Sequence, residues 1–480
     1  MKKLQNLIFK SSLLILLSFC SASSSPELPS NFNDCTVSLD EALNQIEELK
    51  VSSSLSFDVR IVREITNRDE CIDMILGTNL PQGSKLENGK LVDLVVGIKK
   101  DEVTESVKES EYDLYINQLK EKNIQSLNLI VAPSFGSSKV DALIDERNVV
   151  TYIKYENPLG YKFLFSEAEG FIYGVDSENN INMLLDISQK TIRNRESGLH
   201  TFDFLSVDSN NYLIVTYTGI DNKYYFSAFQ ISSSNEILEE KELSIFELQN
   251  DNNVHFGGKI LQNETDILLC LGDLNSPGNS AKFDSPWGKV LSFPKEELLQ
   301  DPILSFEDSR ISFIAYGLRN PWSCFFQGIN LVIPDVGNSH WEEINILENY
   351  KSYEQPVFFG WPWYESYFDS NYQNMPVDED TKISQLANTI FPKFLYPHAN
   401  DYCAIIGGTE LIDQEKWKDY FFVGDFCTGT IWAINTKKNS EIIVLDKNLI
   451  PYSITTINDS GEGTLLVGTT SGQVLEINLP

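Results

Sequence analysis

The sequence predicts a mainly β protein, in which a six-bladed β-propeller over residues 133–480 follows a small α/β or α+β domain at 26–132 and an export signal at 1–25. Beyond about residue 133, helical periodicity is lost and short apolar strands alternate with turns of Gly, Asn, Asp and Ser. A hairpin with Gly near its turn recurs. The roughly 340 residues of this pattern exceed one sandwich or barrel, whereas six blades of about 45 to 60 residues fit the length.

Composition excludes several classes. The chain has 480 residues, 69 of them Asp or Glu and 37 Lys or Arg, which gives a formal net charge of −32. Its hydrophobic fraction of 42% is enough for a packed core, so the chain is not a disordered acidic tail. A strongly negative surface repels phosphate backbones, and we therefore expect no nucleic-acid partner.

The N-terminus is typical of an export signal. Lys2 and Lys3 precede the apolar segment Leu13–Phe19, which is shorter than the roughly 20 residues of a membrane span. Cleavage after about Ala22 is the preferred interpretation, and a lipid anchor at Cys20 is the alternative. Either one predicts a periplasmic or extracellular protein without a transmembrane segment.

The region after the signal is predicted to begin with a polar linker at 26–34 and to continue as a small domain. Ser38 and Glu41 form a capping box that opens a helix with apolar positions Leu39, Leu43, Ile46 and Leu49. The remaining predicted elements are strands at 58–65, 91–98 and 126–132 and a helix at about 102–122. No catalytic motif lies here, and the role of the domain stays open.

The repeated hairpin is the main evidence for blades. Each copy has two apolar strands joined by a turn with Gly near it. The copies span residues 163–173, 421–435 and 465–478.

Seven cysteines are present, and loss of Cys20 leaves six in an oxidising compartment. Cys403 and Cys427 lie in neighbouring strand-like segments and are predicted to pair. Cys35 and Cys71 share the N-terminal region and could also pair. Two cysteines in apolar runs, at positions 270 and 324, could be bridged or remain buried free thiols.

One group of motifs is specific enough to indicate a family. The motifs are AYGLRNPWSCFF (315–326), IPDVGNSHWEEINIL (333–347), FFGWPWYES (358–366), YPHANDYCAIIGG (396–408) and DYFFVGDFCTGTIWAIN (419–435), with weaker matches in VHFGGKI (254–260), LLCLGD (268–273) and ESGLHTFDF (196–204). In order and spacing they resemble the glucose/sorbosone dehydrogenase family of six-bladed propellers. The resemblance covers about 140–480 and leaves out 26–130.

The resemblance implies an oxidoreductase that acts on the CH–OH group of a sugar or related alcohol, with pyrroloquinoline quinone and calcium as cofactors. His255 matches the family's catalytic base, a role that suits imidazole because its pKa lies near neutral pH. Arg319 and Asn320 match residues that contact the quinone, and Asp273 and Leu274 are further candidate cofactor-binding residues. An anionic quinone needs fixed cationic donors, which an arginine supplies.

The resemblance also implies two calcium sites. Gly337 and Asn338 match a turn whose carbonyls hold the cofactor calcium, whereas Glu343 and the carbonyl of Phe359 match a structural calcium site. Carboxylate and carbonyl oxygens are the ligands that calcium prefers.

An aromatic cluster is the candidate substrate pocket. Trp361, Trp363 and Tyr364 could stack on a sugar ring, with blade core or rim as the alternative. The other histidines are expected to have structural roles. His200 is predicted to be a hydrogen-bonded core residue, and the two at 340 and 398 are predicted to lie in surface loops.

Two departures from the family pattern leave a second hypothesis open. Cys427 and Thr428 stand where active relatives carry basic residues, and no Arg follows Arg319 in the chain. With one matching cation, the chain also suits a non-catalytic, calcium-stabilised propeller that binds carbohydrate or protein. The oligomeric state is not indicated.

Overall fold

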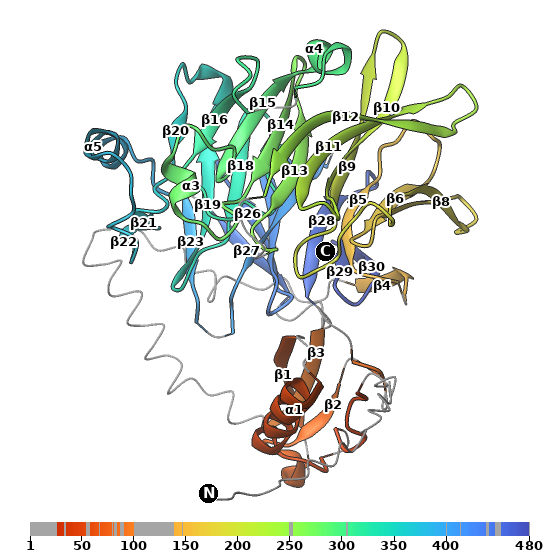
Figure 1. Cartoon of the computed structure of the whole chain (residues 1–480). Helices are drawn as coiled ribbons and strands as arrows, with labels where there is room; N and C mark the ends of the chain where they lie inside the picture. The colour runs from red at the N-terminus through yellow and green to blue at the C-terminus, as the bar shows by residue number, and fades with distance from the viewer. Residues whose placement is uncertain are drawn as a thin grey trace, which may run out of the picture. The chain divides into compact units, whose positions relative to one another are not determined.

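The computed structural model contains two compact units, residues 1–103 and 104–480, which are described separately (Figure 1). Within its described part, no helix is long and apolar enough to cross a membrane. The described residues are 26–32, 35–53, 58–66, 68–78, 80, 84–86, 91–99, 139–145, 147–248, 253–303, 306–399, 401–412, 414–437, 441–446 and 453–479. The export signal, Cys20, the predicted helix at 102–122 and strand at 126–132, and the domain boundary at 132/133 lie outside them.

The N-terminal unit packs one helix with a three-stranded sheet of order β1-β3-β2. Strands β1 and β3 are parallel, and β2 pairs antiparallel with β3. The Glu41 N–H donates to the hydroxyl of Ser38, so the predicted cap forms. The helix and the strands at 58–65 and 91–98 are confirmed, whereas β2 was not predicted. The elements are α1 (Leu39–Ser53), β1 (Asp58–Thr66), η1 (Asp69–Cys71), β2 (Ile75–Thr78) and β3 (Leu91–Lys99).

The predicted linker is wrong in its described part. Leu28 and Phe32 are buried in the core of this unit beside Ala42 and Ile46 of α1. The Leu28 N–H also donates to the carbonyl of Ser84, which fixes the segment to the rest of the unit. The segment is polar on average, but it contains two apolar side chains that enter the core. Burial of such side chains stabilises a small domain by about 1.5–3 kcal/mol each.

The second unit is a six-bladed propeller, as predicted, with one antiparallel sheet for each blade. One sheet carries an added fifth strand, β20, parallel to β16. The strands, sheet by sheet, are β5 (Val150–Lys154), β6 (Phe163–Glu167), β7 (Phe171–Val175), β8 (Ile181–Asp186); β9 (Leu199–Val207), β10 (Asn210–Thr218), β11 (Lys223–Ile231), β12 (Ile237–Glu247); β13 (Gly257–Gln262), β14 (Asp266–Leu271), β15 (Lys289–Pro294), β16 (Ser312–Tyr316), β20 (Val357–Phe358); β17 (Phe325–Gln327), β18 (Asn330–Asp335), β19 (Trp341–Leu347), β23 (Phe394–Pro397); β24 (Ile405–Glu410), β25 (Tyr420–Asp425), β26 (Ile431–Asn435), β27 (Ile442–Asp446); and β28 (Ile454–Asp459), β29 (Leu465–Thr469), β30 (Val474–Asn478), β4 (Lys139–Ile144).

The first strands of the sheets line the axis of the ring. Strand β28 contacts β5, β5 contacts β9, β9 contacts β13, and β24 contacts both β17 and β28. The ring is closed by pairing the two ends of the unit, because β4 forms the outer strand beside β30 (Figure 1). This closure pairs the outer edge of β30, so that β4 becomes the edge strand of the last blade.

Inside the blades, the three predicted hairpins are confirmed as β6/β7, β25/β26 and β29/β30. Apolar side chains from adjacent sheets fill the spaces between blades; one such cluster joins Tyr224 and Phe226 of β11 to Leu269 of β14. The remaining elements lie in loops and are α3 (Gly278–Ala281), α4 (Lys295–Gln300), η3 (Tyr350–Ser352), β21 (Tyr364–Glu365), β22 (Phe368–Asp369) and α5 (Glu379–Ala387).

Six cysteines form three disulfides. Cys403 and Cys427 are joined, as are Cys35 and Cys71 in the N-terminal unit. Cys270 and Cys324, for which a bridge and free thiols were both open, form a disulfide with their Cα atoms 6.4 Å apart. This bridge links β14 of one blade to the segment that enters β17 of the next.

Candidate functional site

His255 lies just before β13, at the end of an innermost strand. Its backbone has φ +60°, a strained left-handed conformation for a histidine. Its N–H donates to Oε2 of Glu196 over 2.7 Å, which holds the strained residue in place. Burial raises the pKa of Glu196, with the His255 and Arg319 charges acting in the opposite direction.

Asp273 follows β14 and holds the His255 ring. Nδ1 of His255 lies 2.7 Å from Oδ1 of Asp273, whose side chain is fully buried. The indole N–H of Trp361 donates to the other carboxylate oxygen over 2.9 Å. An ionised carboxylate only accepts, so Nδ1 carries the proton and Nε2 is left with its lone pair. This is the arrangement that a histidine base requires.

The backbone at this point is closely packed. A Cβ on Gly272 would lie 2.2 Å from the carbonyl oxygen of His255, so only glycine fits. The Asp273 N–H donates to the carbonyl of Arg319, and the Leu274 N–H to that of His255. The side chain of Leu274 is buried in an apolar cluster, so a contact with a cofactor would involve its backbone.

Arg319 and Asn320 enter the same site from the segment after β16. Their backbone N–H groups donate to the buried carboxylate of Asp335. Burial raises the pKa of Asp335 to about 7, although these amides and the Arg319 charge lower it. The Arg319 guanidinium donates to the carbonyl of Val336 over 3.0 Å and lies 5.7 Å from the Trp361 ring centre. Oδ1 of Asn320 is buried and accepts no hydrogen bond from the described residues.

The turn at Gly337 and Asn338 is shaped by two carboxylates, because the Gly337 N–H donates to Glu342 and the N–H groups that follow donate to Glu365. Oε1 of Glu365 accepts from four successive N–H groups, those of residues 338–341, at 2.7–3.1 Å. Burial would raise the pKa of Glu365, but the His340, Ser339 and Trp341 amides lower it overall. A Cβ on Gly337 would lie 1.6 Å from the Trp341 carbonyl. Each N–H group of residues 337–341 therefore donates to a carboxylate, and the carbonyl of His340 accepts from the His398 N–H. The carbonyls of Gly337 and Asn338 are the candidate cation ligands of the turn.

Oxygen atoms gather around Glu343. Its carboxylate is buried and accepts from the N–H of Ser366 and, over 3.5 Å, from the amide of Asn345. Burial, then the charge of Asp335, raises the pKa of Glu343 well above its usual range. Oδ1 of Asn345 and the hydroxyl of Ser366 are buried without a described partner. Such a set suits a hard cation, although no three His, Cys, Asp or Glu residues of the described chain group as a metal site. Phe359, whose carbonyl is the other expected ligand of this site, is buried and directly follows β20.

The three residues of the aromatic cluster lie in different environments. Trp361 contacts the site through Asp273 and Arg319. Trp363 is 0% exposed and its N–H donates to Gln385, so it is a core residue, and its expected place in a substrate pocket is wrong. Tyr364 is half-buried and packs edge-on against Phe391 at 5.3 Å.

The other three histidines lie apart from His255. His200 bonds Thr218 over 2.8 Å and packs on Tyr224, the satisfied position that was predicted. His340 is mostly exposed near Glu365, whereas His398 bonds the buried Glu342.

Two residues of the site escaped sequence reasoning, Glu196 and Glu365. Glu365 is the only acidic residue of the motif FFGWPWYES, which was interpreted through its aromatic residues. Glu196 begins the weaker motif ESGLHTFDF, and no spacing rule connects it to His255.

Solved structures share this fold. The propeller is similar to the soluble aldose sugar dehydrogenase of Escherichia coli, at 16% identity and a TM-score of 0.55, over 72% of this chain and 100% of that one. The pyrroloquinoline-quinone-bound aldose sugar dehydrogenase of Streptomyces coelicolor matches at 16% identity and 0.54, over 73% and 100%. The holo quinone domain of a Coprinopsis cinerea pyranose dehydrogenase matches at 14% and 0.51, over 72% and 98%.

Sequence comparison is less extensive. The chain is 27% identical over 207 residues to the HIPL2 protein of Arabidopsis thaliana, which is 41% of this chain. The matched part spans about a quarter, 26%, of that relative. No protein-family model matches the chain.

Proposed function

We propose that the propeller, which has the fold of the soluble aldose and glucose dehydrogenases, oxidises the CH–OH group of a sugar or related alcohol with His255 as the base. The observation that carries the proposal is the 2.7 Å contact between Nδ1 of His255 and the buried Asp273. It fixes the ring as a base at the end of an inner strand, beside the half-buried Arg319. Export through residues 1–25 and a propeller domain at 133–480 belong to the same proposal.

In this mechanism His255 takes the hydroxyl proton of the substrate on Nε2. The ring becomes cationic as it does so, and the buried Asp273 carboxylate, 2.7 Å from Nδ1, stabilises that charge. Trp361 keeps the carboxylate in place through its indole N–H. Glu196 fixes the strained backbone of His255, so the ring does not move between binding and proton transfer.

Pyrroloquinoline quinone, when bound, would supply the hydride acceptor. Arg319 and Asn320 would hold it, and the buried, unpartnered Oδ1 of Asn320 fits a site that requires a further polar partner. Arg319 is half-buried and already donates to Val336, so one cation faces three carboxylates of the quinone. A divalent ion on the carbonyls of Gly337 and Asn338 would supply the missing positive charge, and the site therefore fits the quinone together with calcium.

The proposed structural calcium would lie at Glu343, where Asn345 and Ser366 offer further oxygens. A cation there would relieve the repulsion that Asp335 and Glu365 exert on this carboxylate. With Phe359 as the carbonyl ligand, the donor set would consist of oxygen atoms throughout, as calcium prefers.

The test is reconstitution of the purified protein with calcium and the quinone, followed by absorbance titration and dye reduction with a panel of aldoses. We expect saturable quinone binding and turnover, and a loss of turnover of at least about 100-fold in His255→Ala. Quinone binding should be similar in the variant. Absence of both binding and turnover in the wild type would refute the proposal.

A second function, a non-catalytic propeller that binds carbohydrate or protein, is favoured by one observation. The Arg319 guanidinium is bonded within its own protein, to Val336 and, at 3.5 Å, to Asn338. If calcium raises the melting temperature while the quinone neither binds nor changes that temperature, this second function replaces the first.

A further inference from the structure

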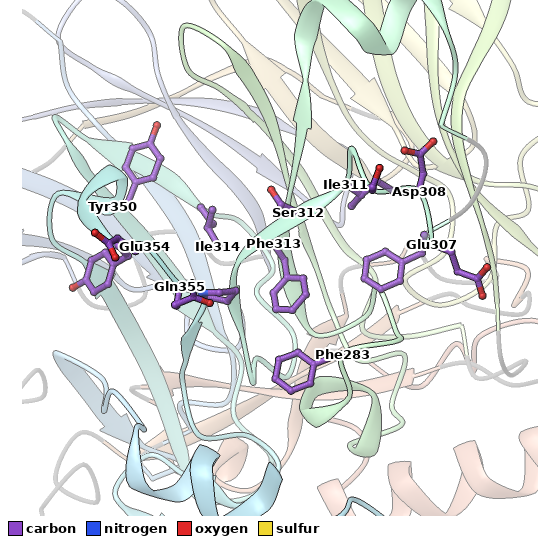
Figure 2. A pocket seen from close by; sticks show the side chains of 14 residues that line it. Phe283, Glu307, Asp308, Ile311, Ser312, Phe313, Ile314, Tyr350, Glu354 and Gln355 are labelled. Atoms are coloured by element: carbon purple, nitrogen blue, oxygen red, sulfur yellow. The ribbon is translucent and has the colours of Figure 1, made fainter. Parts of the chain in front are cut away.

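A separate hollow of about 510 Å³ lies on the blade that contains β16 (Figure 2). Its walls include residues 311–314 and 353–356, and it shares no residue with the cluster around His255. Its volume falls in the usual range for small-ligand pockets. The hollow therefore requires its own explanation.

The hollow exists because the outer edge of this blade is only partly covered. Strand β20 pairs with β16 at Ala315 and Tyr316 alone. The preceding part of β16, Ser312 to Ile314, has β15 on one side and lines the hollow with its side chains. A partly covered strand edge with no further strand leaves space beside it.

Aromatic rings form one wall. Phe283 is 53% exposed, and its ring stacks at 6.0 Å on that of Phe313 and lies 5.3 Å from Tyr316. Figure 2 shows the Phe283 and Phe313 rings side by side. Tyr353, 40% exposed, contributes a further ring. Large exposed apolar side chains in a concave place are typical of binding sites rather than of ordinary surface.

Polar side chains with free bonding capacity surround the rings. Ser309, Ser312, Glu354 and Gln355 line the hollow, and none of them makes a side-chain hydrogen bond with the described residues. They offer both donors and acceptors. This mixture complements hydroxyl groups, which donate and accept at once, whereas a cation would need acceptors only.

Charge restricts the ligand further. Glu307, Asp308 and Glu354 contribute carboxylates, and no Lys, Arg or His is among the described residues that line the hollow. Asp308 is paired with Arg310 at 2.6 Å. On a chain of net charge −32, this lining repels anionic ligands such as uronates and sulfated sugars.

We propose that this hollow binds a neutral saccharide, with one apolar sugar face on Phe283 and hydroxyls bonded to Glu354, Gln355 and Ser312. The site does not depend on the proposed redox function. It would hold a sugar chain against the blade whether or not the centre at His255 turns it over.

The test uses the full chain and saturation-transfer NMR with cellotriose, maltotriose and xylotriose as probes. We expect at least one trisaccharide to bind saturably in the millimolar range, about 4 kcal/mol of binding free energy. Phe283→Ala should weaken that binding at least about tenfold, and Glu354→Gln severalfold. Ile220→Ala, which removes another exposed apolar side chain outside the hollow, is the matched control and should bind normally.

The site is kept distinct from the catalytic proposal by His255→Ala, which should bind the trisaccharide as the wild type does. Loss of binding in His255→Ala, with Phe283→Ala unaffected, would assign the sugar to the centre and overturn the inference. So would the absence of saturable binding for all three probes.

Discussion

At the scale of single residues, the site consists of buried carboxylates that each restrain a different partner. Asp273 holds the His255 ring, Glu196 holds its backbone, and Glu365 holds the turn at 337–341. Each carboxylate is desolvated, a cost that hydrogen bonds from N–H groups offset. The geometry of the site therefore depends on carboxyl groups that bond other parts of the protein.

Glu365 gives the sharpest residue-scale prediction. Glu365→Ala should lower the free energy of unfolding by about 2–4 kcal/mol, because it leaves four N–H donors, part-buried or buried, without their acceptor. Glu365→Gln, which keeps an accepting oxygen, should lose about half as much. Urea unfolding measures both. Glu348→Ala, at an exposed position, is the control; a similar loss there would show that the effect is not specific to the turn.

His200 predicts a pH dependence. Burial, with the Arg193 charge in the same direction, lowers the pKa of His200 to about 3, whereas an unfolded histidine titrates near about 6.5. Between these values the unfolded chain binds one more proton than the native one. The stability contributed by neutral His200 is therefore present above about pH 6.5 and is lost as pH falls, at up to about 1.4 kcal/mol per pH unit.

His200→Gln removes this titration and keeps a group that can bond Thr218. Its unfolding free energy should depend less steeply on pH than that of the wild type between about pH 6.5 and 4. Urea midpoints at several pH values, with m-values to confirm equal exposed surface, measure the difference. Parallel pH curves for the two proteins would contradict the lowered pKa.

At the scale of elements, sequence reasoning succeeded where partners are local. The β25/β26 and β29/β30 hairpins were predicted because each strand, its turn and its partner lie within about 15 residues. The pairing of Val140 in β4 with Ile477 in β30 was not, since alternation of side chains defines a strand but not its distant partner. Leu28 and Phe32 were missed for a related reason: their burial depends on neighbours elsewhere in the chain.

The Cys270–Cys324 bridge connects element structure to the site. Cys270 lies three residues before Asp273, and Cys324 lies four residues after Asn320. The bridge therefore joins the two segments that carry these site residues. A closed loop of this length, with a sequence separation of 54, stabilises the native state by about 4 kcal/mol in the chain-entropy account.

The double variant Cys270→Ala/Cys324→Ala should therefore lower the propeller's melting temperature and, under the proposed function, reduce the turnover of the reconstituted protein. Calorimetry and the dye assay measure these effects. The double variant Cys35→Ala/Cys71→Ala, in the other unit, is the control and should leave the propeller's transition in place. Equal effects of the two double variants on that transition would contradict a local role for the bridge.

At the scale of the whole molecule, the net charge of −32 indicates from sequence that nucleic acid is not a partner. The structure adds that part of this formal charge belongs to the buried carboxyl groups of Asp335, Glu343 and Glu365. Under the proposed function, a cation would stabilise the ionised form of these groups. Sequence could count these charges, but it could not say which of them share one desolvated volume.

These two kinds of negative charge predict different responses to salt. Sodium chloride should raise the melting temperature gradually, because it screens repulsion among exposed carboxylates over about 8 Å at physiological ionic strength. Calcium at the same ionic strength should add a saturable increase, because the proposed site at Glu343 would bind it in the native state only. Magnesium should add less, since it demands a smaller octahedral shell and dehydrates reluctantly. Glu343→Gln should keep the sodium response and lose the calcium increment, which differential scanning fluorimetry would resolve. If calcium and magnesium act alike at matched ionic strength, or Glu343→Gln keeps the full increment, the effect is screening and the buried carboxylates hold no ion.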